Sequence, residues 1–540
     1  METDVVVLGS GASALTAALA ANGHGSDVMV FEKADKIGGT SAWSGGMIWV
    51  PNNPHMIAAG IKDSREEALT YLQSLSHDLI RPELAESFVD HGPEMVSWLE
   101  ENTSVKFQLV ADFPDYHPEH PGGKPTGGRS LECPLISFND LGDNKDRVTV
   151  GYNYGTAPIT MKESHLGSAV PIKVSATEHT RRAENDERGC GQALIGHLYR
   201  ACLEAEIEIT TSARAVELIT ENGRVTGVVI KKDEEELVVH ARGGVILGTG
   251  GFEWNRELVR DFLRGPMTSP VSVPTNEGDG LVMCMRIGAA LGNMREAWWM
   301  PAVEAPGDRG DGLNPTSLFA AERARPRSIM INKKGQRFTN EAANYNAFGA
   351  AFHEQDVARF EYSNLPCWYI FDQEHLDLYG TIETTSGNPA PNWITKAQSL
   401  EELADKIGAD SQGLRHTVSR WNTSVSNYRD EDFHRGESAH DTWWGDPAVK
   451  GTPQATLGPI EKGPFYAIEV KSGALGTKGG PKTDKNGAVL NVDGGVIQGL
   501  YAAGNVMASP MGMTYGGAGG TLAPGMVFGF LAGRDAAGRY

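Results

Sequence analysis

The segment that decides the fold is Asp4-Val-Val-Val-Leu-Gly-Ser-Gly-Ala-Ser-Ala14, which continues into an alanine- and leucine-rich run ending at Ala21. The apolar, β-branched residues before the first glycine predict a strand buried on both faces of a parallel sheet. Gly9 permits a tight turn, and Gly11 lets a pyrophosphate approach the backbone at the start of the next helix. Ala14 is small enough for close contact between helix and strand. The segment therefore predicts a strand, a glycine turn and a helix.

A second predicted strand, Asp27 to Phe31, ends on an acidic residue. Glu32 stands 21 residues after Gly11, where a carboxylate accepts hydrogen bonds from the ribose hydroxyls of a dinucleotide. A glycine-rich turn in another kind of α/β unit is the competing interpretation. Because strand, helix, second strand and acid all occur in register, we expect a Rossmann-like dinucleotide-binding unit.

The composition bounds the class of protein. The chain has 540 residues, of which 65 are glycine, and 40% are hydrophobic. The glycines lie in short motifs without a fixed period, which excludes collagen-like and disordered chains. The length predicts two to four domains. A formal net charge of −21 argues against a nucleic-acid partner, because a binding surface would oppose the overall field.

The cysteine and histidine patterns point away from metals and disulfides. The five cysteines include no CxxC pair, and the 15 histidines form no HxH or HExxH cluster. We therefore predict no metal site. The sequence has no apolar run of about 18 residues and no signal-like beginning, so we expect a cytoplasmic protein without integral membrane association.

The residues after Glu32 favour FAD over NAD. Lys33 leads to Gly38-Gly-Thr-Ser41 and then to Ser44-Gly-Gly46, a second set of close backbone approaches along a long cofactor. With these motifs the chain resembles the flavoprotein family of fumarate reductases, succinate dehydrogenases and 3-ketosteroid dehydrogenases. Covalent flavin attachment in that family uses a histidine in this loop, at the position of Gly39 here. The resemblance thus implies non-covalent FAD.

The organisation of the chain follows the glycine motifs. The strand Gly244 to Leu247 enters Gly248-Thr-Gly-Gly251, which resembles the family's second contact with FAD. The block at 276–280 predicts a helix that runs to about Asn293-Met294, and the polar segment 148–186 predicts an insertion or a lid. We expect an α/β fold in which a Rossmann-like FAD-binding domain is assembled from both chain ends, residues 1–298 and 466–540. An α+β cap or substrate domain, residues 299–465, is inserted between them.

The motifs and the resemblance together assign the FAD contacts to the glycine turns and the residues beside them. The predicted cofactor-binding residues are Gly9, Gly11, Ser13, Ala14, Glu32, Lys33, Gly39, Thr40, Ser41, Ser44, Gly45, Gly46, Thr249, Gly250, Gly504, Asn505, Gly520, Thr521 and Leu522.

A narrower resemblance, to the 3-ketosteroid-1-dehydrogenase branch, rests on five blocks: GTKGG at 476–480, GLYAAGN at 499–505, YGGAGGTLAP at 515–524, FPDY at 113–116 and NEAANY at 340–345. It implies an FAD-dependent dehydrogenase that introduces a C=C bond next to the carbonyl of a 3-ketosteroid or related cyclic ketone. An apolar ketone and an external electron acceptor are the implied partners. By this resemblance Tyr515 and the N–H of Gly519 bind the ketone oxygen, Tyr345 is the base, and Tyr116 assists it.

These residue types suit the chemistry. Removing a proton next to a ketone makes an enolate, which donors aimed at the ketone oxygen stabilise. A tyrosine base has an ordinary pKa of about 10, so it needs a neighbouring hydroxyl or a positive field to act near neutral pH. Steroid-specific members carry two prolines in a Tyr-Pro-Gly-Pro-Gly turn, whereas this chain has Tyr515-Gly-Gly-Ala-Gly519. The steroid and the smaller cyclic ketone both remain open.

Three other flavoprotein functions fit the sequence less well. A fumarate-reductase-like ene reductase uses a His-Thr-x-Gly-Gly block, but its first position is Gly476 in this chain. A disulfide reductase is excluded because no cysteine pair follows Glu32. A non-catalytic flavin sensor or electron carrier would not need a tyrosine in three separate motifs.

Overall fold

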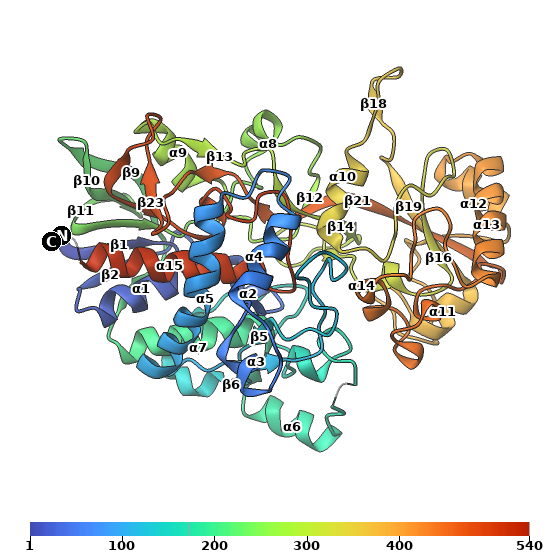
Figure 1. Cartoon of the computed structure of the whole chain (residues 1–540), viewed down its shortest axis with the longest axis horizontal. Coiled ribbons are helices and arrows are strands. Elements are labelled where there is room, and N and C mark those ends of the chain that lie inside the picture. Colours follow the sequence, from blue (N-terminus) through green and yellow to red (C-terminus); the bar gives the residue numbers. More distant parts are fainter. Residues whose placement is uncertain (171, 539–540) are drawn as a thin grey trace.

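The computed structural model describes residues 1–170 and 172–538, which form two large β-sheets, of eight and seven strands, with four smaller sheets and helices around them. Figure 1 shows one sheet at the left, near both chain ends, and the other at the right. The first sheet has the strand order β23-β24-β11-β1-β2-β8. The pairs among its last five strands are parallel; these strands are β24 (Val496–Ala502), β11 (Glu235–Leu247), β1 (Glu2–Leu8), β2 (Val28–Phe31) and β8 (Glu208–Thr210). The expected Rossmann-like core is therefore confirmed.

The amino-terminal motif lies at the centre of this sheet. β1 is paired on both sides, and its valines 5–7 are fully buried. Gly9 has φ +102, and a Cβ there would lie 2.3 Å from the carbonyl oxygen of Gly248, so only glycine fits this turn. Helix α1 (Ala12–Gly23) then packs against α15 (Leu522–Ala537), which is the last helix of the described chain. Both ends of the chain thus build one unit.

Three further helices and two strands lie near the sheet. They are α4 (Arg65–Ser74), α5 (Pro82–Asn102), α7 (Cys190–Glu204), β9 (Ala213–Glu221) and β10 (Arg224–Lys232), the last two extending β11 as antiparallel hairpins. The prediction that the helix of the block at 276–280 reaches Asn293-Met294 is wrong. α9 spans Asp279–Arg286 and stops because Gly288 has φ +79, after which β13 (Leu291–Gly292) pairs with β22 (Gly480–Pro481).

The second sheet belongs mainly to the inserted region. Its main path is β15 (Thr316–Leu318), β14 (Ala297–Glu304), β21 (Phe465–Thr477), β19 (Cys367–Asp372) and β16 (Ser328–Asn332). Helices α11 (Gln373–Tyr379), α12 (Leu400–Ile407) and α13 (Ser411–Ser426) surround it in Figure 1. β21 returns from this sheet toward the first one. The domain boundaries after residues 298 and 465 stay a prediction. No helix in the described part of the chain has both the length and the apolar character needed to span a bilayer.

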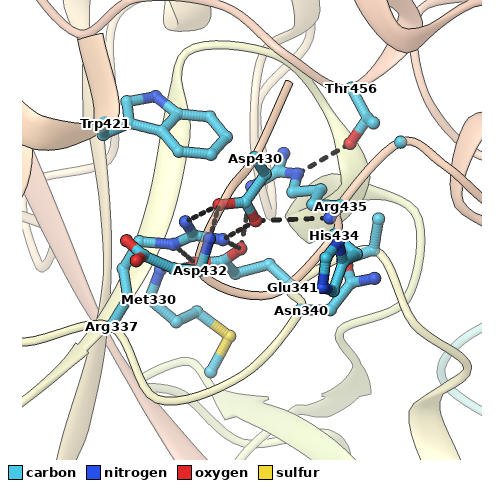
Figure 2. Close-up of polar contacts among 12 residues, drawn as sticks. Met330, Arg337, Asn340, Glu341, Trp421, Asp430, Asp432, His434, Arg435 and Thr456 are labelled. Carbon is cyan, nitrogen blue, oxygen red and sulfur yellow. Dashed lines mark hydrogen bonds and ion pairs between the residues drawn. The ribbon is translucent and has the colours of Figure 1, made fainter. Parts of the chain in front are cut away.

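A buried charge cluster fastens the inserted region internally. Figure 2 shows Arg337 between two carboxylates, at 2.7 Å from Glu341 and 2.8 Å from Asp430. Arg435 lies 3.2 Å from the same Glu341 oxygen, and Glu341 also accepts the backbone N–H of Met330 in β16 at 3.0 Å. Burial raises the pKa of the Glu341 carboxyl, but the two arginines outweigh it and hold the pKa below its ordinary value. The cluster ties the loop after β16 back to that strand.

Replacing the carboxylate of this cluster tests its contribution to stability. Glu341→Gln leaves two buried guanidinium groups with less negative charge, so we expect a loss of about 3 kcal/mol in the free energy of unfolding. Because the folded pKa of Glu341 is depressed, its contribution is present above the unfolded pKa of about 4.3 and is lost as the pH falls. Denaturant titrations at pH 7 and pH 4 measure both effects. Asp90→Asn, which breaks an exposed pair with Arg65, should cost under about 1 kcal/mol; equal costs would contradict the interpretation.

Candidate active site

A cavity of about 450 Å³ extends from the glycine turns of the first sheet to a group of aromatic residues. All predicted cofactor-binding residues line it except Ala14 and Gly520. The methyl group of Ala14 instead meets Gly248, where a Cβ on the glycine would lie only 2.7 Å away. The Thr249 hydroxyl is buried at this cavity without a hydrogen-bond partner, so a ligand atom would satisfy it. These residues fit FAD.

Charged and polar groups mark the adenosine end of the cavity. Glu32 accepts hydrogen bonds from Ser10 Oγ at 2.7 Å and from the N–H of Ala34 at 2.8 Å. Burial raises the pKa of Glu32 despite these bonds. Lys33 is neutralised by Glu277 at 2.9 Å and Asp279 at 3.0 Å. The N-terminus of α1 also opens here, because Gly11 and Ser13 line the cavity.

Three tyrosines from distant parts of the sequence meet at the other end. Tyr116 donates a hydrogen bond to the Tyr345 hydroxyl at 3.1 Å. The Tyr515 ring centroid lies 5.0 Å from that of Tyr116 and 5.4 Å from that of Tyr345. Burial raises the pKa of all three, well above 10 for Tyr116 and Tyr345. Contacts with Tyr345, Thr521 and the N–H of Gly519 partly oppose the increase at Tyr515.

The Tyr116 loop is fixed by the residue before it. Asp115 accepts hydrogen bonds from Arg129 Nη1 and from Trp49 Nε1, both at 2.7 Å, and all three side chains are buried. The backbone N–H of Tyr116 donates to the carbonyl of Gly516 at 3.0 Å. The loop that carries Tyr116 is therefore bonded directly to the turn that follows Tyr515.

That turn lies flat on an indole ring. A Cβ at Gly517 would stand 2.3 Å from Trp49 Cδ1, and one at Gly516 would stand 2.9 Å from Trp49 Cη2. Neither position accepts a side chain, which accounts physically for Gly-Gly in this turn. On the other side, Lys478 donates to the Thr514 carbonyl at 2.7 Å and stands 4.0 Å from the centroid of the Trp298 ring.

Lys478 is a feature that sequence reasoning missed. It lies inside the GTKGG block, and burial lowers the pKa of its amine. The Trp298 ring beneath it contacts the Tyr515 ring at a centroid distance of 4.9 Å. Trp298 and Trp299 are both buried and neither lines the cavity, so they pack in the core.

The segment predicted to be an insertion or a lid is described at residues 148–170 and 172–186, and this part, called the cover below, contributes to the tyrosine end of the cavity. Tyr154, Met161 and Leu166 of this segment are lining residues. Two residues of the inserted region hold it down. Lys450 Nζ donates to the carbonyls of His165 and Ser168 at 3.3 and 3.1 Å, and Trp443 Nε1 donates to the Leu166 carbonyl at 2.9 Å. The segment is thus bonded to the inserted region as a cover.

The remaining wall of the tyrosine end comes from the inserted region and is largely apolar. It is contributed by residues that no motif indicated: Ser317, Leu318, Ala320, Ala321, Glu322, Ile382 and Trp444. Such an enclosure suits an apolar ring system and excludes water from it.

Comparisons with known proteins agree with this geometry. A family model described as FAD binding domain matches residues 4–522. The chain is 42% identical to a 4-oxocyclohexanecarboxylate 2-dehydrogenase of Sinomonas cyclohexanicum, over 99% of this chain and 93% of that protein. It is 39% identical to a 3-oxosteroid 1-dehydrogenase of Mycolicibacterium smegmatis, over 99% and 97%. The structure of 3-ketosteroid delta1-dehydrogenase from Sterolibacterium denitrificans with 1,4-androstadiene-3,17-dione superimposes with a TM-score of 0.92 at 37% identity, covering 100% of both chains.

The attachment of the cover can be tested through Lys450. Lys450→Met keeps the length of the side chain but removes the donor shared by two carbonyls of the cover. A charge-assisted hydrogen bond is worth about 1.5–3 kcal/mol, so we expect backbone amides of 164–168 to exchange with solvent about tenfold faster. Hydrogen-exchange mass spectrometry measures this. Lys406→Met, a change in an exposed lysine of α12, is the control; unchanged exchange in the Lys450 variant would show that the donor does not hold the segment.

Proposed function

The chain belongs to the FAD binding domain family, and we propose that it desaturates a cyclic ketone by a tyrosine-assisted mechanism. It is an FAD-dependent oxidoreductase of the 3-oxosteroid 1-dehydrogenase type. The observation that carries the proposal is the meeting of three phenols and the Gly519 backbone at one end of the FAD cavity.

The ketone oxygen is held by Tyr515 and Gly519 in this proposal. Tyr515 and Gly519 both line the cavity, and the N–H of Gly519 is close enough to the Tyr515 phenol to lower its pKa, so the proposal places the ketone oxygen where it accepts from both. Removing one such donor from an oxyanion site typically costs 10²–10³ in rate, about 3–4 kcal/mol. The burial that keeps Tyr515 protonated also keeps it a donor.

The proton leaves the carbon next to the carbonyl. Tyr345 takes this proton as a phenolate: its own phenolic proton passes to solvent when the ketone binds, and Tyr116, which donates to it at 3.1 Å, then stabilises the negative charge. The site holds both phenols neutral at rest, so activation accompanies the binding of the ketone. FAD, when bound, supplies the acceptor of the β-hydride at N5 and passes the electrons to an external acceptor. We propose that it is bound without a covalent link, because Gly39 has no side chain to form one.

The cavity also argues against reduction of a dicarboxylate. None of its lining residues within the described chain is an arginine or a histidine. A fumarate-like substrate would bring two carboxylates into a wall without such partners, at a large desolvation cost. The ene-reductase direction is therefore not favoured.

The function is tested by mixing the oxidised holoenzyme without oxygen with 4-androstene-3,17-dione and, separately, with 4-methylcyclohexanone. We expect at least one ketone to bleach the flavin absorption band as hydrogen is removed from it. Product analysis should then find the C=C bond next to the carbonyl. If neither ketone bleaches the band while fumarate reoxidises the reduced flavin, the dehydrogenase proposal fails.

The roles of the tyrosines are tested one hydroxyl at a time. Tyr345→Phe and Tyr515→Phe should each slow flavin reduction by about 10²–10³-fold without loss of FAD, because the fold keeps the rings. Tyr116→Phe should have a smaller effect, about tenfold, since it acts on Tyr345. The control is Tyr466→Phe, a buried hydroxyl of β21 that donates to Gln373 far from the cavity lining. Full turnover in the Tyr515 variant would refute the assignment of the ketone site.

A further inference from the structure

One acidic side chain stands in the otherwise apolar wall of the tyrosine end. Glu322 begins the short 3-10 helix Glu322–Ala324 and lines the cavity directly after Ala320 and Ala321. Its backbone carbonyl accepts a hydrogen bond from Tyr369 at 2.8 Å. Arg323, the next residue, is anchored to the carbonyls of Phe319 at 2.9 Å and Ala343 at 2.6 Å. The position of Glu322 is therefore fixed from both sides.

Glu322 belongs to the substrate end and not to the adenosine end of the cavity. Tyr154, also a lining residue, interacts electrostatically with both Glu322 and Tyr515. The other two acids in the lining, Glu32 and Asp279, lie at the adenosine end, where Asp279 pairs with Lys33. A ketone bound at Tyr515 thus extends into a space that Glu322 borders.

No cation among the described residues of the cavity offsets the charge of this carboxyl. Burial raises the pKa of Glu322, and a hydrogen bond from its own backbone N–H and the attraction of Arg325 and Arg323 offset only part of that rise. Neither arginine lines the cavity, and Glu322 makes no ion pair with any residue that the structure describes. A second carboxylate placed beside it would repel its ionised form, and burial would make the two charges more costly still.

The lining offers no counter-charge to an anionic substrate. Among the described residues that line the cavity, Lys33 is the one strong base, and Glu277 and Asp279 occupy it at the adenosine end. A substrate carboxylate at the tyrosine end would lose its hydration without gaining a cation, and would face Glu322. A neutral substrate with an apolar body or a hydrogen-bond acceptor would pay no such cost.

Resting on the proposed function, we propose that Glu322 sets the substrate class: the cavity takes neutral cyclic ketones and rejects ketones that carry a carboxylate on the far side of the ring. The selectivity has two sources: Glu322 cannot form an ion pair with a substrate carboxylate, and none of the described lining residues around Glu322 is a base. A hydroxyl group at the far end of a larger ring system would donate a hydrogen bond to Glu322 instead.

The test compares 4-oxocyclohexanecarboxylate with its methyl ester, which differ in charge at nearly equal size. Both are titrated into the oxidised holoenzyme without oxygen. Binding is measured from the shift of the flavin band, and desaturation from its bleaching. We expect the wild-type protein to prefer the ester by at least about tenfold, the ratio that 1.4 kcal/mol of unpaired charge produces. Glu322→Gln should reduce this preference several-fold, because the variant binds 4-oxocyclohexanecarboxylate more tightly while its affinity for the ester changes little.

Two controls separate the outcomes. Glu361→Gln, in the exposed hairpin strand Glu361–Tyr362, should leave the ratio unchanged. Binding that favours the ester without any bleaching would support the charge selection while the proposed function fails. If the wild-type protein binds and desaturates the acid as well as the ester or better, the inference is overturned while the proposed function stands. An unchanged ester-to-acid ratio in Glu322→Gln would overturn it in the same way.

Discussion

Buried cations hold the three loops on which the proposed active site depends. Arg129 fixes Asp115, one residue before Tyr116, and Lys478 fixes the carbonyl of Thr514, one residue before Tyr515. Arg323 binds the carbonyl of Ala343, two residues before Tyr345. Each of these buried basic side chains donates to the loop that it holds, and moving the loop away would leave a buried donor without its partner. The site is thus positioned by charges that need not touch the substrate.

The two ends of the cavity differ in polarity and in the part of the reaction that they serve. The adenosine end carries Glu32, Lys33 and the start of α1, which suit ribose and pyrophosphate. The tyrosine end is largely apolar apart from its phenols and Glu322, and residues of the cover line it. Low polarity there keeps the phenols protonated and strengthens each hydrogen bond to a developing enolate. The same property makes the site unsuitable for an unpaired charge.

Local sequence was sufficient for the dinucleotide-binding half of this account. The unit from Asp4 to Glu32 is contiguous, so its strand, turn and helix follow from neighbouring residues, and the resemblance to known motifs pointed to the tyrosines. Contacts between distant segments could not be read this way. Lys478, Glu322 and the cover act through partners far away in the chain. The end of α9 was also missed: the chain turns out of the helix at Gly288, and β13 then pairs with the distant β22.

The central claim is that the tyrosines make an enolate before hydride leaves, and proton exchange tests it most directly. The holoenzyme is held with its flavin reduced, so that no net desaturation occurs, and is incubated in D2O with the ketone that bleaches the oxidised flavin fastest. The account predicts that deuterium enters the carbon next to the carbonyl, as seen by NMR, far faster than in buffer, and that Tyr345→Phe abolishes this exchange. Exchange no faster than in buffer, or unchanged in Tyr345→Phe, would contradict it.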